Sequence, residues 1–336
     1  MLTFSELLQD KDFLNRLIYE INKTSEGDKY VIPDKIPPLY RYSGISKYSV
    51  DDIKNCSLTM TAVREYNDMF DSGICIYSNE EELQNLVDCD LKELSDCGID
   101  ITPHIESRKQ FFRREAELKR NTVDYLGAHL CCFSTDDSSI LMWAHYAKNN
   151  TGICVQYDTE EKGNLFKKWA FPVVYRERPI NVSSLLYGEE SYKYRYELAV
   201  MVSVLCKCST WNYENEWRLI SPLFPNDEKK TRYTLKNVPK VKEITFGYHF
   251  LRNCFGKEAD DGKNNIIRIL DFANENAIPI KLVLQDTGKF SLLKQSVEID
   301  RLKLFLEKEF NGRIKSNIPY KTIFSFFQRE VCGMDI

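Results

Sequence analysis

The apolar residues of this chain follow two different spacings, and this feature most limits the folds open to it. Some stretches repeat at the spacing of a helix face and predict helices near the N-terminus and over residues 80–94, 140–147, 191–204 and 293–310. Others are short runs of strand length, at residues 39–42, 57–62, 128–133, 153–157, 171–175, 216–220, 241–246 and 278–284. This mixture predicts an α+β fold, with a mixed β-sheet core and flanking helices.

The length of the chain, 336 residues, exceeds that of most single domains. A chain of this length can bury a full hydrophobic core without disulfides or bound metal. We expect one main α+β domain over residues 36–290. A helical extension over 1–35 precedes it, and a second helical extension over 291–336 follows it.

The charge of the chain is nearly balanced, with 46 basic and 50 acidic residues and a net charge of −4. No overall field therefore attracts it to nucleic acid or to anionic lipid. An acidic residue, Glu6, stands where a signal peptide carries positive charge. The longest apolar-leaning run, 198–206, is too short to cross a bilayer. These features predict a cytoplasmic protein with no membrane partner.

The spacing of cysteine and histidine predicts no metal site. The eleven cysteines are an odd number, and no two of them are spaced as C-x-x-C. None of the four histidines stands at metal-ligand spacing from another histidine or a cysteine. We therefore expect scattered, reduced thiols and no bound metal.

The segment 211–220, W-N-Y-E-N-E-W-R-L-I, is the strongest candidate for a functional site. In an extended chain Glu214, Glu216 and Arg218 share one face, while Trp217 points to the other. The same alternation is typical of a strand with one solvated side. The aromatic residues before the strand would, however, suit a pocket wall. We single out Glu216 as a functional candidate and predict that Trp217, like Trp143, fills the core.

Arg41 lies in a second motif, L-Y-R-Y-S-G over 39–44, and points opposite to Tyr40 and Tyr42 if the segment is a strand. A guanidinium group is always charged and needs a partner among the aromatic residues. That partner is either a bound anion such as a pyrophosphate or a carboxylate of the protein itself. Both alternatives stay open from the sequence.

Two further motifs contain polar residues beside predicted strands. Thr61 ends the strand 57–62, and Asn67 lies in the loop Y-N-D-x-F-D that follows, either as a ligand contact or as a structural turn former. Downstream, C-F-S leads through a helix N-cap region, which would accept an anion, into M-W-A-H-Y-A. His145 and Tyr146 belong to this helix, where a lone histidine is more often packed than catalytic.

In this order the motifs resemble a widespread bacterial family of unknown function. The resemblance rests on L-Y-x-Y, Y-N-D-x-F-D, F-S with M-W-A-H-Y-A and G-x-C, W-x-Y-E-x-E-W-R-L-I and E-I-x-F-G, over about residues 39–285. A more distant likeness is to the ADP-ribosyltransferase superfamily. Its enzymes use an Arg or His on one strand, a small hydroxyl residue on a second, and E/Q-x-E at the start of a later one. Arg41, Thr61 and residues 214–216 occur in that order.

The ADP-ribosyltransferase likeness implies a split β-sheet and NAD as substrate, without a metal. Breaking the nicotinamide–ribose bond makes an oxocarbenium-like centre, which the Glu216 carboxylate would stabilise, while Glu214 would orient or deprotonate the acceptor. Arg41 and Thr61 complete the implied catalytic set. The implied NAD contacts are Arg41, Tyr42, Thr61, Tyr66, Asn67, His145 and Tyr146. The acceptor would be a protein or a nucleic acid, and a toxin or phage-defence role would add an antitoxin or defence-system partner.

Two other functions stay open from the residues. One is a metal-independent nuclease or hydrolase that uses His145 together with Glu216. The other is a non-catalytic binding module in which the clusters around Trp143 and Trp211 are core. Geometry separates the three hypotheses. Arg41, Thr61 and Glu216 around one cleft favour the transferase, His145 beside Glu216 with a basic groove favours the nuclease, and apolar packing of all these side chains favours the binding module.

Overall fold

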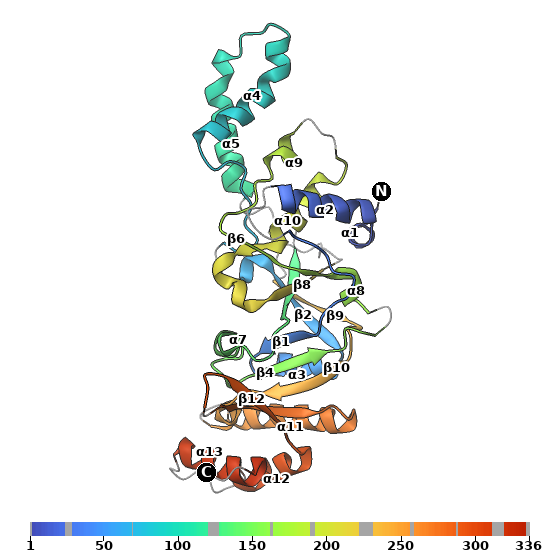
Figure 1. The fold of residues 1–336 in the computed structure, drawn as a ribbon, viewed down its shortest axis with the longest axis vertical. Coiled ribbons are helices and arrows are strands. Elements are labelled where there is room, and N and C mark those ends of the chain that lie inside the picture. The colour runs from blue at the N-terminus through green and yellow to red at the C-terminus, as the bar shows by residue number, and fades with distance from the viewer. Residues whose placement is uncertain are drawn as a thin grey trace.

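The computed structural model describes residues 2–23, 29–68, 70–119, 128–161, 164–188, 192–221, 231–255, 259–286, 288–310 and 319–333. The molecule is elongated (Figure 1). Helices α4 (Glu80–Asp96) and α5 (Thr102–Lys119) lie at one end, and α12 (Ile299–Phe310) and α13 (Tyr320–Cys332) lie at the other. The β-sheet lies between these two pairs of helices.

Within the described residues, ten strands form one mixed sheet, because β10 and β11 pair in parallel and the other pairs are antiparallel. The main path runs in the order β12 (Leu292–Ser296), β11 (Ile280–Gln285), β10 (Val241–Phe246), β4 (Ile153–Tyr157), β1 (Leu39–Ser43), β3 (His129–Ser134), β2 (Ser57–Ala62) and β9 (Arg232–Lys236). Off this path, β8 (Glu216–Ile220) pairs with β3 and with β5 (Ala170–Pro172). A separate parallel pair joins β6 (Val174–Arg176) to β7 (Cys206–Cys208).

Strand β3 has three neighbours although a strand has only two hydrogen-bonding edges. β8 pairs with it along the whole stretch from Leu130 to Ser134. β1 meets β3 only at the pair Tyr40–Ser134, and β2 meets it only at its other end, at Leu130 and His129. β1 and β2 therefore share one edge of β3 and diverge from each other, which opens the sheet between them.

Helices cover the sheet through two main hydrophobic cores. The larger core contains side chains of the sheet and of α3 (Lys47–Lys54), α11 (Ala259–Glu275), α12 and α13; α3 packs against β2, and α12 packs on α11. In the second, α2 (Lys11–Lys23) and α9 (Ser183–Tyr187) surround α10 (Arg195–Leu205). Residues 198–205 of α10 are all buried, as expected for a helix that is apolar on every side. The shorter helices are α1 (Phe4–Leu7), α7 (Ile140–His145), α8 (Phe166–Trp169), η1 (Val63–Glu65), η2 (Ser209–Glu214) and η3 (Phe250–Cys254).

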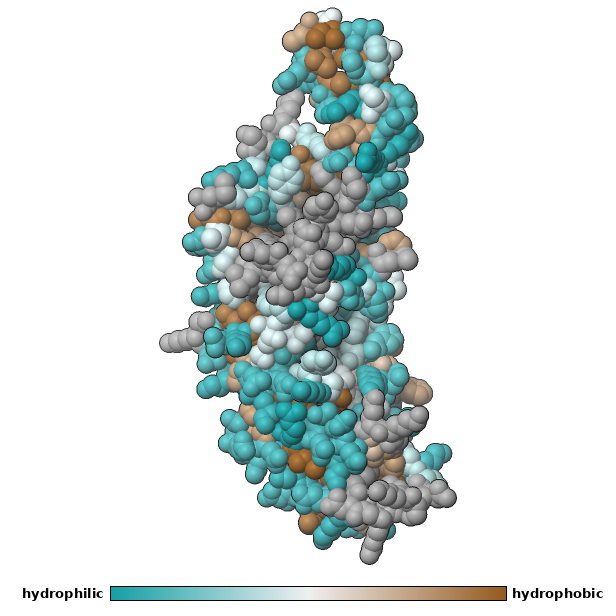
Figure 2. Space-filling view, turned by 180° about the vertical axis from the view of Figure 1, so that it is seen from behind, coloured by the Kyte–Doolittle hydropathy of each residue, from teal (hydrophilic) through white to brown (hydrophobic). Residues whose placement is uncertain are grey.

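The surface seen from behind is mostly hydrophilic, with scattered apolar residues (Figure 2). An apolar group lies at the far end of the α4–α5 pair, where Leu94 and Ile99 are exposed. Among the described residues, no helix combines the length and the apolar character that crossing a membrane requires.

The α+β fold class predicted from the sequence is confirmed, with a mixed sheet and flanking helices. The predicted burial of Trp143 and Trp217 is also confirmed. The predicted helix over 293–310 is wrong at its start, because Leu292–Ser296 is strand β12 and α12 begins only at Ile299. β12 pairs antiparallel with β11. That long-range pairing satisfies its backbone groups and leaves no trace in the local apolar pattern.

The boundary predicted at residue 290 falls between two paired strands of one sheet, β11 and β12. At the other end, Phe13, Leu17 and Ile21 of α2 lie fully buried in the core that contains α10. Both ends of the chain therefore contribute to the cores of the described structure.

Candidate active site

A cleft of about 430 Å³ lies where β1 and β2 diverge along β3. Its volume is within the usual range for small-molecule sites, about 300–1,000 Å³. All the residues that the sequence singled out as catalytic or cofactor-binding line this one cleft: Arg41, Tyr42, Thr61, Tyr66, Asn67, His145, Tyr146, Glu214 and Glu216.

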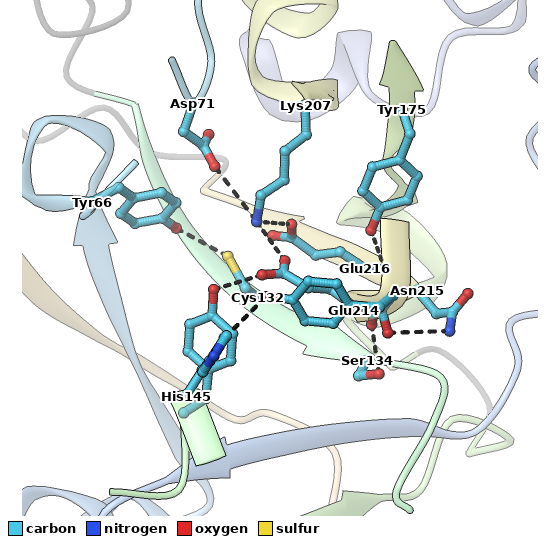
Figure 3. A network of polar contacts seen from close by, with 12 residues as sticks. Tyr66, Asp71, Cys132, Ser134, His145, Tyr175, Lys207, Glu214, Asn215 and Glu216 are labelled. Atoms are coloured by element: carbon cyan, nitrogen blue, oxygen red, sulfur yellow. Dashed lines mark hydrogen bonds and ion pairs between the residues drawn. The ribbon is translucent and has the colours of Figure 1, made fainter. Parts of the chain in front are cut away.

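The two glutamates of the E-x-E motif come from different local structures. Glu214 ends the 3₁₀ helix η2, and Glu216 begins strand β8. Asn215 joins them in the left-handed conformation, with φ 46° and ψ 52°, which asparagine tolerates better than most residues. The motif is therefore not extended as predicted, yet both carboxylates still contact one group, the Lys207 ammonium (Figure 3).

A buried network of ion pairs surrounds these carboxylates. The Nζ of Lys207 lies 2.5 Å from Glu214 Oε2, 2.8 Å from Glu216 Oε2 and 3.8 Å from Asp71 Oδ2. Arg218 donates through Nε to Glu216 Oε1 at 2.8 Å and through Nη2 to Asp71 Oδ2 at 2.6 Å. All five side chains are nearly excluded from solvent. The strand β8 is buried on both faces, so the alternative of an ordinary strand with one solvated side is wrong.

The two carboxylates have pKa values that are shifted in opposite directions. Burial opposes ionisation of Glu216, but Arg218 and Lys207 outweigh it and lower the pKa to about 2. Burial raises the pKa of Glu214 above its ordinary value, although Lys207 acts against that rise. Two neighbouring carboxyl groups with separated pKa values are the arrangement that acid–base enzymes use.

Neutral groups hold the two glutamates from other sides. The Tyr146 hydroxyl donates to Glu214 Oε1 at 2.6 Å, and Ser134 Oγ donates to the Glu214 carbonyl oxygen at 2.6 Å. The Glu216 backbone N–H donates to the Tyr175 hydroxyl at 2.8 Å. These bonds come from the residue that follows α7, from β3 and from β6, so three segments fix the position of the E-x-E motif. Ser134 and Tyr175 are seen in Figure 3.

Arg41 forms an ion pair with a carboxylate of the protein, which was one of its two predicted partners. Nη1 lies 3.0 Å from Asp52 Oδ2 on α3, and Nη2 donates to the Thr59 carbonyl oxygen. The predicted opposition to Tyr42 is confirmed, because the Tyr42 ring packs edge-on against Trp143 of α7. The register pairs Tyr40 with Ser134 and Ser134 with Glu216. Arg41 therefore points to the other face of the sheet from Glu216, and the two line the cleft from opposite sides of the opening.

The other predicted residues stand on the walls of the cleft. The Tyr66 hydroxyl lies 3.2 Å from Cys132 Sγ, and the Asn67 side chain is exposed. The Nδ1 atom of exposed His145 lies 3.0 Å from the Tyr213 hydroxyl. Its neighbour Tyr146, rather than His145 itself, contacts the E-x-E motif.

Sequence reasoning missed Lys207 and Asp71 as site residues. Lys207 stands between two cysteines directly after the apolar stretch of α10. The sequence could have identified Lys207, because a lysine buried at the end of an apolar stretch needs a charged or polar partner. Asp71 was noted only as part of a loop. Among the described residues, no group of three or more His, Cys, Asp or Glu side chains is arranged to hold a metal ion.

Residues 142–219 match a family model whose description is protein of unknown function (DUF2971). The matched segment runs from α7 into β8 and contains His145, Tyr146, Lys207, Glu214 and Glu216. The predicted resemblance to an uncharacterised family is confirmed by this match. Neither the curated proteins nor the solved structures contain a significant match to the chain.

Proposed function

We propose that the cleft binds NAD and that the protein transfers ADP-ribose from it to an acceptor or to water. The proposed activity is that of an ADP-ribosyltransferase or an NAD glycohydrolase. The observation that carries the proposal is that Arg41, Thr61 and Glu216 line one cleft. They stand on β1, β2 and β8, in the order in which the ADP-ribosyltransferase superfamily uses a basic residue, a hydroxyl and E-x-E.

The separated pKa values of the two glutamates support different roles for them. Glu216, whose pKa is about 2, stays ionised at neutral pH and stabilises the positive charge that develops on the ribose. Glu214 has a raised pKa and is therefore a stronger base than an ordinary carboxylate. Its contact with the Tyr146 hydroxyl fixes its orientation.

The reaction breaks the bond between ribose C1′ and the nicotinamide nitrogen, and the electron pair leaves with nicotinamide. A new bond forms between C1′ and an oxygen or nitrogen of the acceptor. The acceptor loses its proton to Glu214, which later releases it to solvent. Water as the acceptor gives free ADP-ribose, and a protein or nucleic acid gives a modified macromolecule.

In this proposal, NAD lies between the two walls of the cleft. Arg41 has five N–H groups, and its bonds to Asp52, Thr59 and Tyr157 leave donors for a pyrophosphate. Tyr66 is the better ring to stack on nicotinamide, because Tyr42 is buried against Trp143. Thr61, Asn67 and His145 line the same space.

A non-catalytic binding module is the second candidate, and one observation favours it. Both oxygens of Glu216 already accept hydrogen bonds from Arg218 and Lys207, and the side chain is almost fully buried. A nuclease that pairs His145 with Glu216 has less support, because the hydrogen-bond contact of His145 is with Tyr213.

The test is release of nicotinamide from NAD by the purified full chain, followed by chromatography. A parallel incubation with labelled NAD and cell lysate detects transfer to macromolecules. Glu214→Gln should lower the rate by about 10²–10⁴-fold, the usual worth of a general base. Glu93→Gln, on the exposed face of α4, is the matched control and should leave the rate unchanged.

If NAD stays intact after incubation with the wild-type chain, both alone and with lysate, the proposal is wrong. Calorimetric binding of NAD without turnover would then support the binding module. The proposed setting is the cytoplasm, as a toxin or phage-defence effector with an antitoxin or defence-system partner. Those expectations come from the family resemblance and need the labelled acceptor to be identified.

A further inference from the structure

Lys207 is a buried lysine whose ammonium group faces the cleft. It stands in β7, immediately after α10, and is 6% exposed. The Trp211 ring covers it, with Nζ 5.3 Å from the ring centroid. One nitrogen atom thus contacts both glutamates of the E-x-E motif and approaches Asp71 (Figure 3).

Arg218 already supplies the structural connection between these segments. It is fully buried, binds Asp71 and Glu216, and donates to the Val204 carbonyl oxygen at 2.7 Å. It is not among the residues that line the cleft, whereas Lys207 is. Replacing buried ion pairs by apolar residues is often neutral for stability. Lys207 therefore adds a contact with Glu214 that Arg218 does not make, on the side of the network that lines the cleft.

We propose that Lys207 is a positioning residue for the reaction in the cleft, because its ammonium group holds Glu214 and Glu216 side by side and decides which of them carries a proton. This inference rests on the proposed function of the same site. Asp71, Glu214 and Glu216 bring three negative charges against the two positive charges of Lys207 and Arg218. One proton on a carboxyl group makes the cluster neutral.

When the cluster takes up a proton, Glu214 is the carboxylate that accepts it, so Glu214 is the group that gains and loses a proton during the reaction. Glu216 is bonded by both cations, whereas Glu214 has Lys207 as its cation and Tyr146 as a neutral partner. Lys207 therefore acts most directly on the base of the proposed reaction. Other titratable and charged groups surround Lys207 and the two glutamates. They are Tyr66, Asp71, Cys132, His145, Tyr146, Tyr175, Tyr213 and Arg218.

The first experiment measures nicotinamide release against pH for wild type, Lys207→Met and Lys207→Arg. Removal of an opposite charge at this distance raises a carboxyl pKa by about one to three units. The acid limb of the profile should therefore move up by that amount in Lys207→Met. Lys207→Arg retains the positive charge and should keep the acid limb of the pH profile near its wild-type position. It should nevertheless lower kcat about tenfold or more, because the two carboxylates would contact different nitrogen atoms of the planar guanidinium group instead of one ammonium nitrogen.

The second experiment needs no substrate and separates this inference from the proposed function. Glutamate carboxyl carbons are followed by NMR against pH, and Glu214→Gln identifies the Glu214 signal. A higher Glu214 midpoint in Lys207→Met supports the inference even if wild type leaves NAD intact. If the Glu214 titration midpoint, or the acid limb of the pH profile for nicotinamide release, is the same in Lys207→Met as in wild type, the inference is wrong. If Lys207→Met does not fold, Lys207→Arg decides: unchanged kcat in a folded protein overturns the inference.

Discussion

At the scale of single residues, Glu216 is needed by the fold as well as by the proposed reaction. Glutamine has the same shape but no charge, so Glu216→Gln leaves Arg218 and Lys207 short of one partner. Breaking a buried ion pair costs roughly 3–5 kcal/mol, and we expect the free energy of unfolding to fall by that amount. Urea denaturation measures it. Glu93→Gln is the control, and equal stability of the two variants would contradict an ionised network.

The pH dependence of stability tests the same carboxylate. The pKa of Glu216 is about 2 in the folded protein against an ordinary value of 4.5, so the unfolded state binds more protons between those pH values. The stability that Glu216 contributes is therefore present above pH 4.5 and is lost as the pH falls toward 2. Thermal melts from pH 2 to 6 should show a steeper loss in wild type than in Glu216→Gln. If the melting temperatures of the two proteins fell in parallel with pH, the pKa of Glu216 would not be lowered in the folded protein.

Arg41 combines a structural contact with a proposed ligand contact. Arg41→Ala should weaken NAD binding by roughly 1.5–3 kcal/mol, the worth of a charge-assisted hydrogen bond, measured by calorimetric titration. Asp52→Ala removes the ion pair but keeps the guanidinium, and so isolates the structural part. If both variants lower the melting temperature and neither changes NAD affinity, Arg41 is structural only.

The sequence predicted which residues line the cleft, but it did not predict which side chains they contact. The spacing of Glu214 and Glu216, and the directions of Arg41 and Tyr42, follow from local periodicity and were predictable. The contact of Lys207 with Glu214 depends on β7 lying beside η2, which no local pattern encodes. The burial of both faces of β8 depends equally on distant segments.

At the scale of elements, the junction between η2 and β8 controls where the two carboxylates meet. Asn215 has a left-handed backbone and an exposed side chain. Most L-residues pay about 1–2 kcal/mol for this conformation, whereas glycine adopts it freely. Asn215→Ala should therefore lower stability by about 1 kcal/mol and reduce nicotinamide release, while Asn215→Gly retains both. Denaturation and rate measurements on the two variants check this, and equal behaviour would show that the turn does not set the motif.

The elements themselves were predicted best where the apolar pattern is strong. β1, β2, β4, β8 and β10 lie within one residue of the predicted runs. The run 171–175 instead forms two short strands, β5 and β6, which pair with different partners. β9 was not predicted, although Arg232–Lys236 alternates exposed and half-buried residues, because it has no fully buried face. Hydrogen bonding to partner strands determines both the division of 171–175 into two strands and the formation of β9. These partners are distant in the sequence, so the local apolar pattern does not reveal them.

At the scale of the whole molecule, the terminal helices contribute side chains to the two main hydrophobic cores. α1 and α2 bury Leu7, Phe13 and Leu17, and the C-terminal helices bury Leu302, Leu306 and Phe327. Each fully buried side chain of this kind contributes about 1.5–3 kcal/mol, and a whole protein is stable by only about 5–15 kcal/mol. The burial free energy that is lost with both ends is therefore comparable to the whole stability of the protein.

A chain cut to residues 36–290 should therefore not unfold in one cooperative transition, because it also lacks β12, the partner of β11. Circular dichroism melts of the full chain, 36–290, 36–336 and 1–290 measure this. The two single truncations show which end contributes more to stability, since α2 packs on α10 and α12 packs on α11. A sharp transition of 36–290 at the full-length midpoint would instead establish the independent domain that the sequence suggested.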